Sequence, residues 1–494
     1  MRKSGILLSI SSLPSKYGIG CLDEAAYDFV DQLQEAGQKV WQILPIGPTG
    51  YGDSPYQSFS TFAGNPYFIS LDALVEKGWL TREECEKNSE VEDPQFVDYG
   101  ALYYKRFPLL KKAYNNSGIA EDAEFQTFMK KNQSWLEEYS LFMAIKDDHN
   151  GAPWTTWENP LRLHDPEALK VEKERLEKEI LYYCFLQYLF FTQMKALLDY
   201  AHEKGIQILG DIPIYVSPDS ADVWANPELF QLDEDNRLTA VAGCPPDAFA
   251  ADGQLWGNPL YRWEYHKETG YEWWIRRIRH CYETCDILRI DHFRGFDEYF
   301  SIPAGDKDAK GGHWEKGPGI ELFHAIRDAL GEREIVAEDL GYVTDTVREL
   351  VQNTGFPGMK ILEFAFDSRD TGSAADYLPH NYIQNSVAYT GTHDNATLLG
   401  WLDEILPEER EAVRAYVCSE ADGKELIWPM ICTVLRSVSK LAVIPMQEYL
   451  EYGNEARMNK PSTNGTNWKW RLKDGEFSKD LIEKIAKATK LYGR

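Results

Sequence analysis

Two residues of opposite charge lie two positions apart in the stretch from Asp286 to Gly295, which reads Asp-Ile-Leu-Arg-Ile-Asp-His-Phe-Arg-Gly. The stretch is typical of a buried strand, and because successive strand residues face opposite sides, Arg289 and Asp291 point the same way. A guanidinium beside a carboxylate keeps that carboxylate ionised and oriented, as a nucleophile must be. A structural ion pair at a strand end would give the same pattern, and this stretch alone favours neither interpretation.

Three more carboxylates, Asp211, Glu338 and Asp394, stand at or just after the ends of other short apolar runs. Each alone could be a helix cap or a salt bridge, but four at matching positions, with Asp291, favour a functional site. Several carboxylates without a phosphate-binding loop suggest either a divalent metal or glycosidic bond chemistry. Arg289 counts against the metal, because a cation on the same strand face as Asp291 competes with it.

Glycosidic bond cleavage needs one ionised carboxylate at the anomeric carbon and one protonated acid at the leaving oxygen. Asp291 beside Arg289 suits the first role. Glu338 follows an apolar run, and such a setting near another negative charge raises the pKa of a carboxyl group, which suits the second role. His393 and Asp394 are adjacent at a strand end, where both can turn inward. There His393 could bind sugar hydroxyls while Asp394 holds the sugar ring distorted.

Eight short apolar runs, most of them separated by helical stretches, would position these groups. The runs are residues 6–10, 40–46, 206–213, 287–291, 335–338, 360–364, 387–389 and 442–445. Eight is the number of strands with which a parallel (β/α) barrel closes, and functional groups of such a barrel lie at the carboxyl ends of its strands. The sequence therefore predicts an α/β fold, a (β/α)8 TIM barrel.

The connection between the second and third runs is too long for a plain loop. Much of residues 72–193 has helical spacing, which predicts a large, mostly helical insertion between the second and third barrel strands. We expect residues 1–71 and 194–494 to form the catalytic barrel and residues 72–193 to form the inserted subdomain. Residues 243–263, rich in proline, glycine and aromatic residues, are expected to be a long rim loop or lid.

Composition excludes several classes of partner. The net charge of −27 over 494 residues argues against nucleic acid and anionic membrane surfaces, but not against a neutral substrate. The most apolar segment, residues 181–194, is too short to span a bilayer. The eight cysteines are scattered, which makes zinc unlikely on spacing and indicates a reduced cytosolic chain. Fifteen tryptophans and 28 tyrosines hint at carbohydrate, since flat rings stack on sugar faces.

The motifs as a set resemble the α-amylase clan, and specifically the 4-α-glucanotransferases of glycoside hydrolase family seventy-seven. They extend over nearly the whole chain in a specific order: Ser-Ser-Leu-Pro-Ser-Lys-Tyr-Gly-Ile-Gly from Ser11, Gly-Asp-Ser-Pro-Tyr-Gln from Gly52, Gly-Asp-Ile-Pro-Ile-Tyr-Val from Gly210, the segment from Pro245, Leu-Arg-Ile-Asp-His-Phe-Arg-Gly from Leu288, Val-Ala-Glu-Asp-Leu-Gly from Val336, Gly-Thr-His-Asp-Asn from Gly391, and Asn467-Trp468. α-Amylases usually carry a histidine five residues after the third-strand aspartate. Val216 stands at that position, which favours the glucanotransferase branch.

The resemblance implies roles for individual residues. Asp291 would be the nucleophile, Glu338 the general acid and base, and Asp394 the stabiliser of the transition state. The residues implied to bind substrate are Arg289, His393 and Asp211, around the bond that is cut, and Ser54, Tyr56, Gln254 and Trp256, along the glucan. The resemblance also implies the helical insertion, and catalysis without a metal or cofactor.

We therefore expect a cytoplasmic 4-α-glucanotransferase that moves segments of α-1,4-glucans or maltooligosaccharides to glucose or glucan acceptors by a retaining double displacement. A monomer or weak homo-oligomer is expected. One alternative is an α-glucan hydrolase of the same clan, which shares the first step and uses water in the second. Another is a non-catalytic glucan-binding protein, and a third is a metal-dependent enzyme on the same barrel.

Overall fold

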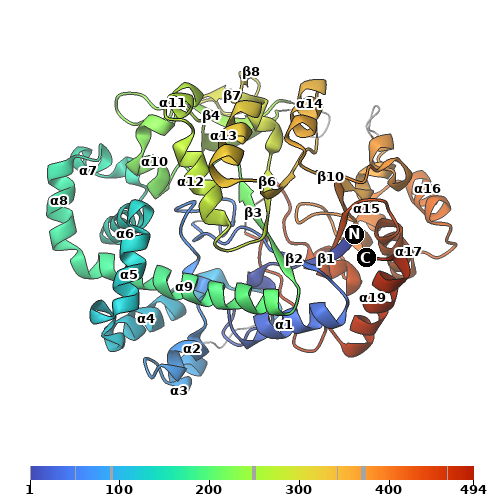
Figure 1. The fold of residues 1–494 in the computed structure, drawn as a ribbon, viewed down its shortest axis with the longest axis horizontal. Helices are drawn as coiled ribbons and strands as arrows, with labels where there is room; N and C mark the ends of the chain where they lie inside the picture. Colours follow the sequence, from blue (N-terminus) through green and yellow to red (C-terminus); the bar gives the residue numbers. More distant parts are fainter. Residues whose placement is uncertain are drawn as a thin grey trace.

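Eight parallel strands form the centre of the fold in the part of the chain that is described (Figure 1). The computed structural model describes residues 2–50, 52–88, 93–246, 252–341, 343–368, 374–463 and 465–494. The strands are β1 (Lys3–Leu7), β2 (Val40–Gln42), β3 (Gln207–Pro213), β6 (Ile287–Asp291), β9 (Glu334–Ala337), β10 (Gly358–Ile361), β11 (Ser386–Tyr389) and β12 (Leu441–Pro445). They are almost entirely buried and largely apolar, as strands covered on both faces must be.

The sheet curls into a nearly closed barrel with the strand order β10-β11-β12-β1-β2-β3-β6-β9. Between β9 and β10 the described residues form no regular ladder. The two strands still approach each other there, because the Ala337 amide donates to the carbonyl of Pro357 at 3.0 Å. The predicted (β/α)8 barrel is thus confirmed.

Helices cover the outside of the barrel (Figure 1). Apart from those in the connection between β2 and β3, the helices of the described residues are α1 (Glu24–Glu35), α10 (Ala221–Ala225), α11 (Trp263–Glu268), α12 (Glu272–Cys281), α13 (Ile320–Leu330), α14 (Asp345–Thr354), α15 (Leu398–Glu404), α16 (Pro407–Val417), α17 (Lys424–Leu435), α18 (Met446–Tyr449) and α19 (Lys479–Tyr492). The repeat is incomplete at one point. Between β10 and β11 the described residues form short 3-10 helices, Leu362–Phe366, Ala374–Tyr377 and Pro379–Asn381, in place of an α-helix.

The long connection from β2 to β3 is helical where it is described. Its helices are α2 (Leu71–Glu76), α3 (Arg82–Lys87), α4 (Tyr99–Ser117), α5 (Ala123–Lys131), α6 (Gln133–Asp148), α7 (Asn159–Arg162), α8 (Pro166–Arg175) and α9 (Glu177–Glu203). The expected boundary at residue 193 falls inside α9, which contacts α5 and α6 as well as α1 and β3. That these helices form a separate subdomain stays a prediction. No helix among the described residues is long and apolar enough to cross a membrane.

A second, antiparallel sheet lies beside the barrel and differs from what we expected of residues 243–263. Its strands are β4 (Ala240–Cys244), β5 (Gln254–Pro259), β7 (Glu298–Pro303) and β8 (His313–Lys316), in the order β5-β4-β7-β8. Much of the expected rim loop is therefore strand, and residues 247–251 of it lie outside the described residues. Val241, Phe300, Ile302 and Ala309 give this sheet a small apolar cluster of its own.

Candidate active site

Arg289 joins two carboxylates at the carboxyl ends of β3 and β6. The register of these strands places Asp211 opposite Arg289. The guanidinium Nη1 contacts both Asp211 oxygens at 2.8 and 2.7 Å, and Nη2 contacts Asp291 Oδ1 at 2.8 Å. The Asp211 side chain is fully covered, whereas 28% of the Asp291 side chain is exposed. Asp291 is therefore the carboxylate of this pair that a ligand can reach.

Glu338 follows β9 and lies against the backbone that leaves β6. Its Oε2 accepts the His292 amide at 2.6 Å and its Oε1 accepts the Leu340 amide at 3.0 Å. His292 has φ +53°, a left-handed conformation, as the chain turns sharply after Asp291. Burial, reinforced by the negative charge of Asp291, raises the pKa of Glu338 to about 8, although Arg289 and the two amides act in the opposite direction. Glu338 thus carries a proton at neutral pH.

Asp394 is held in the loop that follows β11. Asn459 Nδ2 donates to Asp394 Oδ1 at 2.6 Å, Arg457 Nη2 donates to the Asp394 carbonyl at 2.6 Å, and His393 Nε2 lies 3.4 Å from Asp394 Oδ2. Burial alone would raise the pKa of Asp394, but His393 and Asn459 outweigh it and hold that pKa well below its usual range. The same contact with Asp394 raises the pKa of His393 against the effect of burial. Asp394 is therefore ionised.

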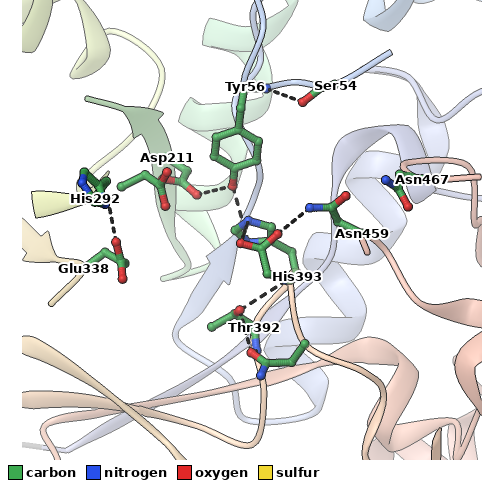
Figure 2. A network of polar contacts seen from close by, with 12 residues as sticks. Ser54, Tyr56, Asp211, His292, Glu338, Thr392, His393, Asn459 and Asn467 are labelled. Carbon is green, nitrogen blue, oxygen red and sulfur yellow. Dashed lines mark hydrogen bonds and ion pairs between the residues drawn. The ribbon is translucent and has the colours of Figure 1, made fainter. Parts of the chain in front are cut away.

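Tyr56 lies between Asp211 on β3 and His393 in the loop after β11, and it contacts both (Figure 2). Its hydroxyl donates to Asp211 Oδ2 at 2.7 Å, and its ring stacks on the His393 ring with centroids 5.0 Å apart. The Tyr56 amide donates to Ser54 Oγ at 3.3 Å, which braces the loop after β2 that carries both residues. The chain Arg289–Asp211–Tyr56–His393 thus orders one wall of the site.

Trp256, on β5 of the second sheet, contacts the His292 ring, and the His292 amide binds Glu338. The two rings meet edge to face with centroids 4.7 Å apart. Trp256 Nε1 donates to Gln254 Oε1 at 3.0 Å, so both residues of the strand are ordered together. Burial, with the charge of Arg294 also contributing, lowers the pKa of His292 to about 4 despite the nearby Asp291. A neutral His292 therefore lies between Trp256 and Glu338.

The structure brings the ten predicted site residues into one connected region, mainly at the carboxyl rim of the barrel, and it adds two that sequence reasoning missed. Asn459 and Arg457 follow β12, in a stretch without an apolar run to mark it. The only sequence signal was a cluster of polar residues after the eighth strand. Among the described residues, no group of three or more His, Cys, Asp or Glu side chains is placed to hold a metal ion.

A (β/α)8 barrel with an arginine-held carboxylate and a protonated glutamic acid at its carboxyl rim defines a barrel enzyme that uses carboxyl groups. Comparison with known proteins gives the family. The chain belongs to glycoside hydrolase family 77, the 4-alpha-glucanotransferases, whose family profile matches residues 8–477.

Individual relatives resemble the chain over its whole length. The 4-alpha-glucanotransferase of Clostridium butyricum is 48% identical, over 99% of this chain and 100% of the relative. That of Thermus thermophilus is 46% identical, over 99% of each. Among solved structures, the amylomaltase from Streptococcus agalactiae in complex with acarbose superposes with a TM-score of 0.96, at 41% identity and with 100% of both chains covered.

Proposed function

We propose that the protein is a 4-α-glucanotransferase that moves a segment of an α-1,4-glucan to the 4-hydroxyl of an acceptor glucose or glucan, with Asp291 as nucleophile and Glu338 as general acid and base. The observation that carries these roles is the contrast between two neighbouring carboxyl groups. Asp291 is ion-paired with Arg289, whereas the pKa of Glu338 is raised to about 8. Retaining glycosidic chemistry needs this division between an ionised and a protonated carboxyl group.

The first half-reaction forms a bond between Asp291 and the anomeric carbon of the donor. The glycosidic C1–O4 bond breaks, and Glu338 gives its proton to the departing oxygen, so that a shortened glucan leaves with a free 4-hydroxyl. In the second half-reaction the 4-hydroxyl of the acceptor attacks C1, Glu338 takes its proton, and the ester bond to Asp291 breaks. Two inversions at C1 retain the α configuration.

The other site residues suit the positioning of sugar. Asp394 is ionised and lies beside His393, so it can accept hydrogen bonds from sugar hydroxyls and stabilise positive charge that develops on the ring. Tyr56, His393 and Asp211 are already hydrogen bonded or stacked with one another and provide a rigid wall. Trp256 and Gln254 extend the polar and aromatic surface along the second sheet, where the glucan would lie.

Transfer, as opposed to hydrolysis, rests on the family and on the names of the relatives, because the carboxyl groups alone serve both reactions. The test is incubation of the pure protein with maltotriose and a chelator, followed by separation of the products by chain length. A ladder of longer glucans with free glucose is expected, and Asp291→Asn is expected to remove it. Glucose and maltose alone would indicate a hydrolase, no products a binding protein, and loss of activity in chelator a metal enzyme.

A reducing compartment and a monomer or weak homo-oligomer belong to the same proposal. No disulfide bond joins the eight cysteines, all of which lie among the described residues, as expected of a chain that works in the cytoplasm. The net charge of −27 disfavours close approach of two copies. Light scattering coupled to size exclusion would give a mass close to 56.7 kDa for a monomer.

A further inference from the structure

Two buried glutamates lie against the loop that carries Asp394, Glu363 near its start and Glu448 at its end. Glu363 lies in the 3-10 helix Leu362–Phe366 and is 3% exposed, and Glu448 lies in α18 and is 2% exposed. The Glu363 amide donates to the Thr390 carbonyl at 3.3 Å, where the loop begins. Glu448 Oε2 accepts the Leu398 amide at 2.8 Å, where α15 begins. His393 and Asp394 lie between these two attachment points.

The Glu363 side chain packs directly under the loop. A Cβ atom placed on Gly391 would lie 2.9 Å from Glu363 Oε1 and 3.1 Å from the Asn395 Cβ, so the loop leaves no room there for a larger residue. Glu363 Oε1 and the neighbouring Thr390 Oγ1 are both buried without a hydrogen-bond partner. The Glu363 carboxyl group therefore packs closely against the loop backbone at Gly391.

Neither glutamate has a salt-bridge partner among the described residues. The charged groups that face Glu363 are Glu448 on α18, Arg457, and Glu404 at the end of α15. The guanidinium of Arg457 is already bound to the carbonyls of Asp394 and Asn459. Two buried carboxylates without a paired cation would be very costly, so the pair holds at least one proton.

The protonation of the pair follows from its surroundings. Burial, and then the charge of Glu448, raises the pKa of Glu363 well above its usual range, although a hydrogen bond with the Asn395 side chain and the charge of Arg457 act in the opposite direction. Burial raises the pKa of Glu448 to about 8, against the hydrogen bond from Leu398. At neutral pH Glu363 is therefore a carboxylic acid and can donate a hydrogen bond, whereas its ionisation would place a negative charge beneath the loop and beside Glu448.

We propose that Glu363 and Glu448 are positioning residues for the proposed reaction, and that they keep Asp394 in place only while Glu363 carries its proton. The inference rests on the proposed function, because it takes Asp394 to act on the substrate. Activity would then fall at alkaline pH because Glu363, a buried group that does not touch the sugar, loses its proton. Glu338 produces a limit in the same direction, so the two must be separated.

A donor with a good leaving group separates them. With α-maltosyl fluoride as the probe, fluoride leaves with little help from an acid, so the burst of fluoride release depends weakly on the proton of Glu338. We expect the wild-type burst rate to fall at alkaline pH. Glu363→Gln keeps the shape and a donor but cannot ionise, so it should stay within about twofold of the wild-type rate at neutral pH and lose the alkaline fall. Glu363→Ala should lower the rate about 100-fold, with KM little changed, because the loop is displaced.

The control is Asp222→Asn. Asp222 is another buried carboxyl group, whose pKa burial raises to about 6, but it accepts the Thr61 amide and lies on α10, which follows β3 rather than β11. This variant should keep the wild-type pH profile. A second readout needs no turnover. Because the pKa of Glu363 is raised on folding, its contribution to stability is lost as pH rises, so Glu363→Gln should raise the melting temperature relative to wild type at alkaline pH.

Two results would overturn the proposal: superimposable pH profiles of the wild type and Glu363→Gln, or a Glu363→Gln variant as slow at neutral pH as Glu363→Ala. Failure of the proposed function would look different, since the wild type would then give no glucan ladder from maltotriose. In that case the melting temperatures still test whether the proton on Glu363 supports the loop.

Discussion

Arg289 supplies the positive charge that pairs with two carboxylates of the site, because its one guanidinium contacts both Asp211 and Asp291. Arg289→Met would leave Asp211 buried without a cation, and removing one partner of a buried pair costs about 3–5 kcal/mol. We expect a large fall in the free energy of unfolding and loss of activity. Arg289→Lys keeps the charge but cannot form the planar fork, and should lower kcat about 100-fold.

Arg175 is a matched control, because it also bridges two carboxylates, Asp148 and Glu172, but it is 45% exposed. Arg175→Met should change the free energy of unfolding by less than about 1 kcal/mol. Urea denaturation of the two methionine variants makes the comparison. Equal losses in the free energy of unfolding would show that burial does not increase the contribution of the Arg289 ion pairs to stability.

Glu338 gives a second prediction at this scale. Its pKa is raised to about 8, and the first half-reaction needs the proton, so single-turnover cleavage of maltotriose should fall as pH rises through about 8. Glu338→Gln should lower disproportionation by at least about 100-fold, within the range for loss of a general acid, yet retain a fluoride burst from α-maltosyl fluoride. A variant that lost both activities equally would show that Glu338 has another role.

At the scale of elements, the sequence predicted the barrel well because each strand is an apolar run buried on both faces. Two strand ends differ from the prediction. β1 ends at Leu7, not Ile10, and β10 at Ile361, not Phe364, because Ile10 and Leu362 belong to 3-10 helices, whose buried positions take apolar residues although they form no strand. β4 and β5 gave no signal, because glycine and proline interrupt the alternation of residues 240–259.

The site follows the same rule. Asp211, Asp291 and Glu338 could be found because they stand where strands end, and parallel strands end at one rim. Asn459 and Arg457 could not be found in this way, because they lie in an irregular segment, where no strand end indicates which residues face the site. Glu363 was hidden as well, because it is a single acid inside an apolar run and gives no sign of its partner Glu448.

The close packing of β3 against the segment before β6 gives a prediction for these elements. A Cβ on Gly210 would lie 2.9 Å from both Cβ and Sγ of Cys285, so Gly210→Ala should move β3, next to Asp211. Overpacking of this kind costs about 1–3 kcal/mol. Cys285→Gly in the same chain should restore much of the lost free energy of unfolding and activity. Additive losses in the double-mutant cycle would mean that the two sites do not press on each other.

At the scale of the whole molecule, the last residue of the chain fastens the barrel at β1 and β12. The guanidinium of Arg494 donates to the carbonyls of Lys3 at 2.8 Å, Ser439 at 3.1 Å and Ser437 at 3.0 Å, and also to that of Leu435. Arg494→Ala should lower the free energy of unfolding by about 2–4 kcal/mol, because charged hydrogen bonds are lost from partly buried carbonyls.

Lys490→Ala, on the exposed face of α19, is the control for this prediction and should leave stability within about 0.5 kcal/mol. Glucan disproportionation at a temperature well below the transition should be unchanged in both variants, since neither residue touches the site. A loss of activity with Arg494→Ala at that temperature would indicate that the barrel itself changes shape.

The contact between Arg494 and Lys3 also means that the two ends of this chain lie side by side (Figure 1). In a ring of strands, the position of the two chain ends matters little for how the strands pack against one another. A few added residues could splice the ends, and new ends could open at the surface turn between α16 and α17. The eight-strand ring would then run in rotated order, with the same side chains meeting at its rim.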